Sequence, residues 1–443
     1  MEKPRVSHKI KLLVRVSRFM TSYLQELLMK IEKYSFGVGD RFARQGKAQL
    51  AAMIEAAKLG TEVVPVWNKS FREHSIVHTE PASTRREADE AVSALGWHKG
   101  YYADADHINM SNVAGFTAHC DFFTLDVADY IGESAAQADI DAFVAKYSSF
   151  AGELVIDGIE EPLIITRQQI RDIASKTLLA VQKAGEIYRF IEGEKGAGNF
   201  VTEVSMDETE LAQQPVEILF ILAAISDEGI CAQTIAPKFT GRFNKGVDYV
   251  GDVSVFDKEF NDDLAVIRYA VGRFGLPENL KLSVHSGSDK FSIYPVISAA
   301  IKRFDAGLHI KTAGTTWLEE IIGLAAAGGE GLEIAKMVYC RALERFDELC
   351  GPYAAVIDID KSKLPSAEAV NEWTSDEFKY TLTHNPSCPK YNLHARQLIH
   401  VGYKVAAELG AEYLEAVEKY EGLIAQHVTY NILERHIKPL FLS

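Results

Sequence analysis

Ionisable side chains of this 443-residue chain gather at the ends of short apolar runs that lie far apart in the sequence. The runs end in Asp104, Asp106 and His107, in Asp126, in Glu203 and in His285. Alternate side chains share one face of a strand, so Asp104 and Asp106 point the same way. Carboxylates and neutral imidazoles that meet at one point, without thiolates, suit Zn²⁺, Mn²⁺ or Ni²⁺. We therefore predict a metal site made by Glu203, His285 and His107, with Asp106 as the alternative to His107.

Other polar groups at the same ends suit acid–base catalysis or substrate binding. The candidate catalytic residues are Asp104, Asp106, Asp126 and Lys238. The candidate substrate-binding residues are Asp40, Arg41, Ser286, Ser288, Asp289, Lys311, His394 and Arg396. Structural roles are open as well: Asp126 can cap a helix, and the two lysines can pair with acids. The helix face with Arg396 and His400 can be solvated, or it can lie over the site and clamp a carboxylate.

A repeated unit of strand, polar loop and amphipathic helix must position these residues. Strands are predicted at residues 34–42, 62–68, 101–107, 122–129, 199–207, 232–239, 280–289 and 308–317. About eight such units form an α/β fold, the (β/α)8 TIM barrel, whose active site lies at the carboxyl ends of the strands. An open doubly wound sheet needs a similar count, but no GxGxxG or Walker-type loop supports it.

The chain is predicted to contain three segments besides the repeated strand–helix units. Residues 34–330 form the barrel, and residues 131–198 are an insertion after strand 4 with a hairpin and a long helix. Residues 331–443 are predicted as a helical C-terminal extension packed on the barrel, and residues 1–33 as a basic N-terminal arm and helix. Thr84 and Glu87 have the spacing of a capping box, which predicts a helix start.

Composition narrows the possible partners. A formal net charge of −15 argues against nucleic acid, because phosphate-backbone binding needs clustered Lys and Arg. No apolar run approaches the roughly 20 residues of a membrane span, so no membrane association is expected. The five cysteines form no CxxC pair, which favours reduced thiols in a cytoplasmic protein. The expected partner is a small molecule, and a homo-oligomer is an open possibility.

Five runs of the chain resemble the tagaturonate epimerase family. They are YYADADHINM (101–110), DFFTLDVADYIG (121–132), KLSVHSGSDKFSIYP (281–295), HIKTAGTTWLEE (309–320) and YNLHARQLIHVGYK (391–404). The resemblance extends from about residue 34 to the end, and the basic start does not match it. It implies a divalent-metal-dependent enzyme of hexuronate catabolism that interconverts D-tagaturonate and D-fructuronate. It also implies weak action on fructose and tagatose.

The implied reaction limits the chemistry, because the inverted carbon lies one position beyond the carbon next to the ketone. Its hydrogen is not acidified by the carbonyl, so simple enolisation does not invert it. Retro-aldol cleavage can invert this carbon, because the aldehyde fragment rotates and is re-added on its other face. This route requires a divalent metal, acid–base groups and an anchor for the substrate carboxylate. Transient oxidation by a nicotinamide is the other route, and the sequence has no dinucleotide loop for it.

Three other functions fit parts of the pattern. Paired carboxylates on a barrel also occur in glycoside hydrolases, but only four Trp are present for a sugar-stacking cleft. A metal-dependent aldolase of sugar acids would use the same cleavage step and release the fragments. A non-catalytic sugar-acid binding protein would not require so many ionisable strand ends.

Overall fold

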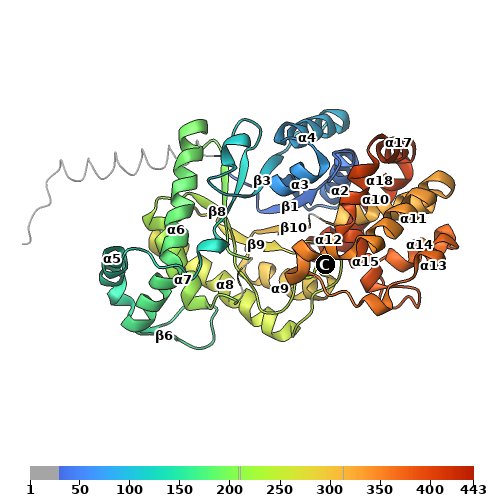
Figure 1. Cartoon of the computed structure of the whole chain (residues 1–443). Helices are drawn as coiled ribbons and strands as arrows, with labels where there is room; N and C mark the ends of the chain where they lie inside the picture. The colour runs from blue at the N-terminus through green and yellow to red at the C-terminus, as the bar shows by residue number, and fades with distance from the viewer. Residues whose placement is uncertain (1–28, 208, 210, 313) are drawn as a thin grey trace, which may run out of the picture.

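Eight parallel strands close into a barrel at the centre of the molecule (Figure 1). The computed structural model describes residues 29–443 except 208, 210 and 313. The strands are β1 (Tyr34–Gly39), β2 (Val64–Ser70), β3 (Tyr102–Ile108), β4 (Phe122–Asp126), β7 (Val201–Ser205), β8 (Ala232–Ala236), β9 (Lys281–His285) and β10 (Leu308–Lys311). Pairing of β1 with β10 completes the ring. The predicted (β/α)8 barrel is confirmed, and the open doubly wound sheet is excluded.

Helices cover the outside of the barrel. They are α2 (Gly46–Lys58), α3 (Phe71–Val77), α4 (Pro81–Leu95), α6 (Arg167–Lys195), α7 (Pro215–Asp227), α8 (Val253–Phe274), α9 (Tyr294–Phe304) and α10 (Thr315–Ala327). The link from β3 to β4 carries a 3-10 turn, η1 (Val113–Gly115). α4 begins at Pro81, a residue whose fixed φ suits a first helical turn. The predicted capping box is therefore wrong, since Thr84 and Glu87 lie inside α4 with buried side chains.

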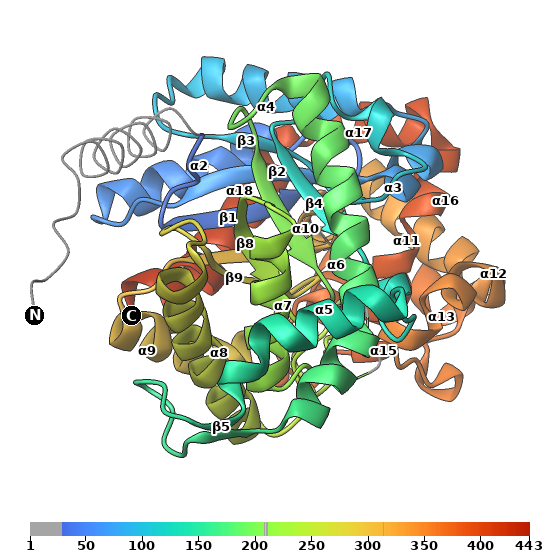
Figure 2. The same cartoon turned by 90° about the vertical axis from the view of Figure 1, so that its left-hand side faces the viewer.

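The insertion after β4 contains α5 (Gln137–Tyr147) and a small antiparallel hairpin. The hairpin pairs β5 (Gly152–Leu154) with β6 (Leu163–Ile165). The long helix α6 packs against β4 and α7, so it serves as the barrel helix between β4 and β7. The segment added to the repeat is therefore 131–166, which is shorter than the predicted 131–198. Figures 1 and 2 place it on the side of the barrel opposite the C-terminal helices.

The C-terminal region is helical, as the sequence predicted. It comprises α11 (Gly329–Glu344), α12 (Phe346–Cys350), η5 (Gly351–Val356), η6 (Lys361–Lys363), α13 (Ala367–Asn371), α14 (Ser375–Leu382), α15 (Leu393–Val401), α16 (Tyr403–Leu409), α17 (Ala411–Lys419), α18 (Glu421–Tyr430) and a π-helical end, η7 (Asn431–Leu442). α18 packs against α10 and α2, and η7 packs against α9. Apolar contacts and buried polar bonds, such as Tyr294 Oη to His436 Nδ1 at 2.6 Å, attach this region to the barrel.

The start of the described chain lies at the amino-terminal end of the barrel. Met29 donates its backbone N–H to Gly198, and Ile31 donates to the side chain of Gln233. Most of the predicted arm and helix, residues 1–28, lies outside the described residues. Within residues 29–443, apart from the three gaps, no helix combines the length and the apolar character that a membrane crossing requires.

The interior of the barrel is polar. Outward-facing side chains such as Phe36 and Trp67 are apolar and buried under the helices, whereas the inward face carries acids, hydroxyls, imidazoles and amines. Gly37 is required at one point of this face: a Cβ there would lie 2.8 Å from Lys311 Cγ and 3.1 Å from Lys311 Cα. The absence of a side chain at position 37 therefore gives the Lys311 side chain room to extend along the inner wall.

Candidate active site

Lys311, at the end of β10, is the centre of a buried ionic cluster. Its Nζ lies 2.7 Å from Asp104 Oδ2, 2.8 Å from Asp106 Oδ1 and 3.0 Å from Glu203 Oε1. Thr124 bridges the same groups, since it contacts the ammonium and donates to Asp104. Burial favours a neutral amine, but the three carboxylates outweigh it and raise the pKa of Lys311 well above its ordinary value. Burial also raises the pKa of Asp104 to about 7, although Lys311 opposes that shift. Asp104, Asp106 and Lys311, each predicted separately as a site residue, thus lie in contact with one another.

His285, at the end of β9, lies between two carboxylates. Its Nε2 is 2.8 Å from Glu203 Oε1, and its Nδ1 is 3.1 Å from Asp207 Oδ1. Both oxygens of Glu203 are bonded, because Thr234 donates to Oε2 at 2.8 Å. Burial alone would lower the pKa of His285, but Asp207 and Glu203 raise it to about 9. The ring is thus fixed from below by Glu203, with its opposite nitrogen directed at Asp207.

His107, at the end of β3, completes the cluster. Its Nδ1 lies 3.0 Å from Asp126 Oδ2, and its Nε2 lies 3.9 Å from Asp106 Oδ1. The rings of His107 and His285 meet edge to face with centroids 5.1 Å apart. His107 has a positive φ of 50°, a conformation that few non-glycine residues adopt, and such strain concentrates at functional sites.

The same residues fit a divalent cation. Ligand atoms of His107, Asp207 and His285 lie within 4.8 Å of one another. Asp126 and Glu203 each hold one nitrogen of an imidazole, which is how carboxylates orient metal-binding histidines. The His285 Nδ1 is buried, and its 3.1 Å contact with Asp207 Oδ1 lacks the geometry of a hydrogen bond. The donor types and their spacing therefore agree with a divalent cation between these atoms.

The charge of the cluster supports the same interpretation. Five carboxylates, Asp104, Asp106, Asp126, Glu203 and Asp207, surround the single ammonium of Lys311 and two imidazoles. Buried carboxylates without compensating charge are costly. Without a metal, protons on the two histidines are the available compensation. One divalent cation carries the charge of those two protons, so it can replace them without changing the charge of the cluster.

The two residues predicted at the end of β1, Asp40 and Arg41, have different roles in the structure. Asp40 accepts the backbone N–H groups of Phe42, Ala43, Arg44 and Gln45, which shapes the turn into α2. Its acceptor positions face the backbone and do not face the cluster. Arg41 is buried, pairs with Glu73, and lies with its guanidinium carbon 4.8 Å from the centre of the Tyr403 ring.

The residues predicted after β9 form a second buried ionic cluster. Asp289 Oδ2 lies 2.7 Å from Arg396 and 3.1 Å from His384, and its Oδ1 lies 3.1 Å from His436. Arg396 also donates to the carbonyl oxygens of Gly246 and Leu382. Asp289 and Arg396 thus bind one another and tie α15 to the barrel loops, although the sequence suggested that both bind substrate.

The remaining predicted residues lie outside the two ionic clusters. Ser286 donates to the Lys311 carbonyl at 2.7 Å, and Ser288 accepts the Gly246 N–H at 2.9 Å, so both hydroxyls order loops. Lys238 lies two residues beyond β8, half-buried, and its ammonium makes no ion pair within the described ranges. His394 accepts the Asp360 N–H at 3.1 Å in the C-terminal region.

Asp207 and Thr124 belong to the cluster and were absent from the predicted site. Asp207 lies beyond the end of β7 and also accepts a hydrogen bond from Ser205 at 2.5 Å. The alternation that selected Glu203 and Ser205 continues to Asp207, so that signal was present in the sequence. Thr124 gave no comparable signal, since a hydroxyl in a strand is usually a packing residue.

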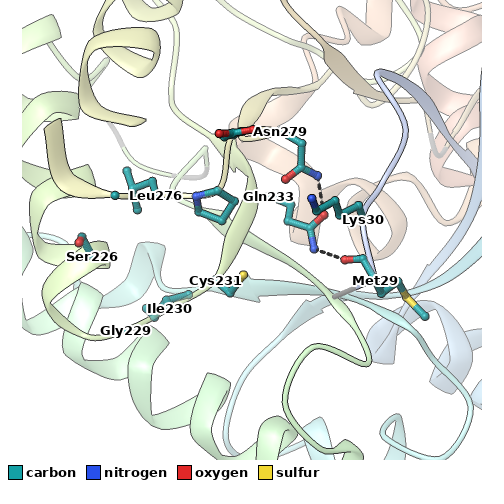
Figure 3. Close-up of a pocket in the computed structure, with 12 residues that line it drawn as sticks. Met29, Lys30, Ser226, Gly229, Ile230, Cys231, Gln233, Leu276 and Asn279 are labelled. Atoms are coloured by element: carbon teal, nitrogen blue, oxygen red, sulfur yellow. Dashed lines mark hydrogen bonds between the residues drawn. The ribbon is translucent and has the colours of Figure 1, made fainter. Parts of the chain in front are cut away.

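The cavity shown in Figure 3 lies elsewhere. It has a volume of about 410 Å³ and is lined by Met29, Gln233 and Asn279 among other residues at the amino-terminal end of the barrel. Gln233 donates to the Met29 carbonyl, and Asn279 donates to Gln233. Only Lys30, Cys231 and Glu278 among its lining residues are ionisable. The convergence of ionisable groups that chemistry requires is therefore at the opposite end.

A closed barrel with an ionic cluster at the carboxyl ends of its strands defines the class of TIM-barrel enzymes. The profile of the UxaE tagaturonate epimerase family matches residues 8–440, so the chain belongs to that family. The tagaturonate/fructuronate epimerase of Thermotoga maritima is 28% identical over 422 residues, which are 92% of this chain and 80% of that protein.

Two crystal structures of the fructuronate-tagaturonate epimerase UxaE from Cohnella laeviribosi have the same fold. The glycerol complex has a TM-score of 0.74 at 22% identity and covers 92% of this chain and 82% of its own. The native structure has a TM-score of 0.74 at 21% identity, with 94% and 83% covered.

Proposed function

We propose that this protein interconverts D-tagaturonate and D-fructuronate with the help of a divalent metal ion. Family membership over residues 8–440 indicates an epimerase. The observation that carries the proposal is the meeting of His107, Asp207 and His285 beside the Lys311–Asp106 pair. This arrangement joins a site for a cation to a carboxylate that can move a proton, which retro-aldol chemistry requires.

His107, Asp207 and His285 would hold the cation, which would supply Lewis-acid stabilisation of negative charge on the substrate oxygens. Asp126 and Glu203 then act through the two histidines and are positioning residues. Glu203 remains a possible ligand from the sequence pattern, but its bonds to His285, Thr234 and Lys311 favour Asp207 for that role.

Asp106 is the group we assign to proton transfer. It takes the proton of the hydroxyl on the inverted carbon, and the O–H electron pair becomes part of a new C=O bond. The bond to the carbon beside the ketone breaks, and its electron pair passes into an enediolate. The aldehyde turns over, the enediolate carbon attacks its other face, and the new alkoxide takes a proton back. Lys311 holds Asp106 in place throughout and keeps it ionised until it accepts that proton.

The neutral ketoses fructose and tagatose carry the same stereochemical difference but no carboxylate. We expect this protein to act on them more weakly than on the uronates, because an ionic anchor would be lost.

The test is to incubate protein loaded with Zn²⁺, Mn²⁺ or Ni²⁺ with D-tagaturonate and follow the products by ¹³C NMR. The proposal predicts D-fructuronate and a stable equilibrium between the two acids. Accumulation of a three-carbon aldehyde acid would identify an aldolase instead. No conversion with any of the three metals would reject the proposal.

A further inference from the structure

A group of cations lies in the connections that follow three barrel strands, at the end of the barrel that carries the ionic cluster. Arg41 follows β1, Arg72 follows β2 and Lys245 follows β8. These loops leave the same end of the barrel as the ends of β3, β7 and β9, which carry His107, Asp207 and His285. We call Arg41, Lys245 and His400 the basic rim.

Two tyrosines of the C-terminal region connect the basic rim. Tyr353 of η5 lies under Arg72, at 4.2 Å from its guanidinium carbon, and 5.6 Å from Lys245 Nζ. Tyr353 Oη is 3.0 Å from Tyr403 Oη, and the Tyr403 ring lies against Arg41. The backbone N–H of Lys245 donates to the carbonyl of Val356 at 2.8 Å, which fixes this loop to η5. Side chains from distant parts of the sequence thus form one connected wall.

His400, on α15, is the third member of the basic rim. Its side chain is buried, and its Nε2 has no hydrogen-bond partner among the described residues. A Cβ at Gly314, in the loop after β10, would lie 1.8 Å from this nitrogen, so only glycine leaves it space. The nitrogen is thus held at the loop between β10 and α10.

The local potential at His400 is positive. Burial, followed by the charges of Lys245, Arg41, Arg396 and Lys290, holds the pKa of His400 well below its ordinary value. Arg41 is also nearly buried, and its Nε lacks a hydrogen-bond partner in the described part of the chain. Two buried nitrogens without hydrogen-bond partners, Arg41 Nε and His400 Nε2, thus lie in a cationic environment that suits a bound anion.

We infer that Arg41, Lys245 and His400 bind the carboxylate of the sugar acid and so determine the preference for uronates over neutral ketoses. This inference rests on the proposed function, since it assigns one end of that substrate. Arg41 pairs with Glu73 but keeps an Nε without a hydrogen-bond partner among the described residues. Lys311 is shared among three carboxylates, and Arg396 is bound to Asp289 and two carbonyl oxygens.

Binding of an unreactive pair of probes tests the inference. D-galactonate carries the carboxylate but no ketone, and galactitol is its neutral counterpart. We expect calorimetric titration of the metal-loaded protein to show galactonate binding that Lys245→Gln and His400→Asn each weaken by about tenfold, the loss of one charge-assisted or buried hydrogen bond. Galactitol affinity and bound metal should stay unchanged in both variants. Arg242→Gln is the matched control, because Arg242 lies on the same loop and forms an exposed ion pair with Asp358.

The result that overturns the inference is wild-type galactonate affinity in both variants, or no galactonate binding by the wild-type protein. The two proposals fail separately. A wild-type protein that does not convert tagaturonate rejects the epimerase activity. A wild-type protein that converts it, with variants whose KM for tagaturonate is unchanged, rejects only the carboxylate site.

Discussion

His285 Nε2 lies 2.8 Å from Glu203 Oε1, and this bond leaves the opposite nitrogen of the ring facing Asp207. Glu203 thus orients the imidazole from inside the barrel, while Asp207 stands at the position of a ligand. Two carboxylates only four residues apart, one at β7 and one in the loop that follows it, therefore have different roles.

Substituting these two acids distinguishes their roles. Asp207→Asn removes a ligand and should abolish stoichiometric metal binding and turnover. Glu203→Gln removes only the orienting charge and should weaken metal affinity by about 10- to 100-fold. Metal content after dialysis and a metal-titration curve measure both. A larger loss in Glu203→Gln than in Asp207→Asn would restore Glu203 as the ligand.

Metal removal should stop the reaction without unfolding the barrel. The ligands come from β3, β9 and the loop after β7, all of which are held by sheet pairing and an apolar core. We expect a chelator to remove activity, a divalent metal to restore it, and the circular dichroism spectrum to stay constant. Full activity after complete chelation would favour a carboxylate-only mechanism such as that of a glycoside hydrolase.

Lys311→Met should both inactivate and destabilise the protein. The substitution leaves Asp104, Asp106 and Glu203 buried without their shared cation, a change that costs about 3–5 kcal/mol when a buried pair is broken. A large fall in the thermal midpoint measures it. Lys258→Met is the control, since Lys258 is 68% exposed and its pair with Asp262 is worth at most about 1 kcal/mol. Equal midpoints for the two variants would contradict the central place of Lys311.

Gly37→Ala tests the space that Lys311 occupies. The new methyl group would press on Lys311 Cγ at 2.8 Å and Cα at 3.1 Å, so we expect a loss of about 1–3 kcal/mol, typical of overpacking, and reduced turnover. Gly193→Ala, in the last turn of α6 with open space at its Cβ position, should instead stabilise by up to about 1 kcal/mol. Unfolding midpoints compare the two, and a neutral Gly37→Ala would show that Lys311 does not need this space.

Glu320 should make stability depend on pH. Burial, followed by the charge of Asp40, raises the pKa of Glu320 to about 8. A carboxyl with a raised pKa contributes stability that is present below its unfolded value and is lost as the pH rises through about 8. Glu320→Gln should therefore show a smaller fall in thermal midpoint between pH 5 and pH 8 than the wild-type protein. Glu333→Gln, at a residue 68% exposed, should behave as wild type; a fall of wild-type size in Glu320→Gln would contradict the assignment.

The sequence predicted the barrel because each of its strands is short, apolar on one face and followed by a polar loop. Strand ends therefore identified Asp104, Asp106, His107, Glu203, His285 and Lys311, which the structure brings together. Alternation along a strand is a local property, so a single sequence reveals it.

The remaining contacts depend on long-range packing. Arg396 lies 107 residues from Asp289, and nothing in either local pattern indicates that the two neutralise one another. Asp40 looked like a site residue because it follows a strand, yet its oxygens are used by the turn that it begins. Only the folded structure distinguishes polar residues that bind one another or the backbone from polar residues that face a substrate.

Anomalous X-ray scattering from crystals soaked in Mn²⁺ or Zn²⁺, measured at the absorption edge of the metal, tests the proposed metal site directly. We predict one strong peak bounded by His107, Asp207 and His285, with Asp106 and Lys311 beside it. A peak at another place in an active crystal, or full activity in a protein that shows no peak, would contradict it.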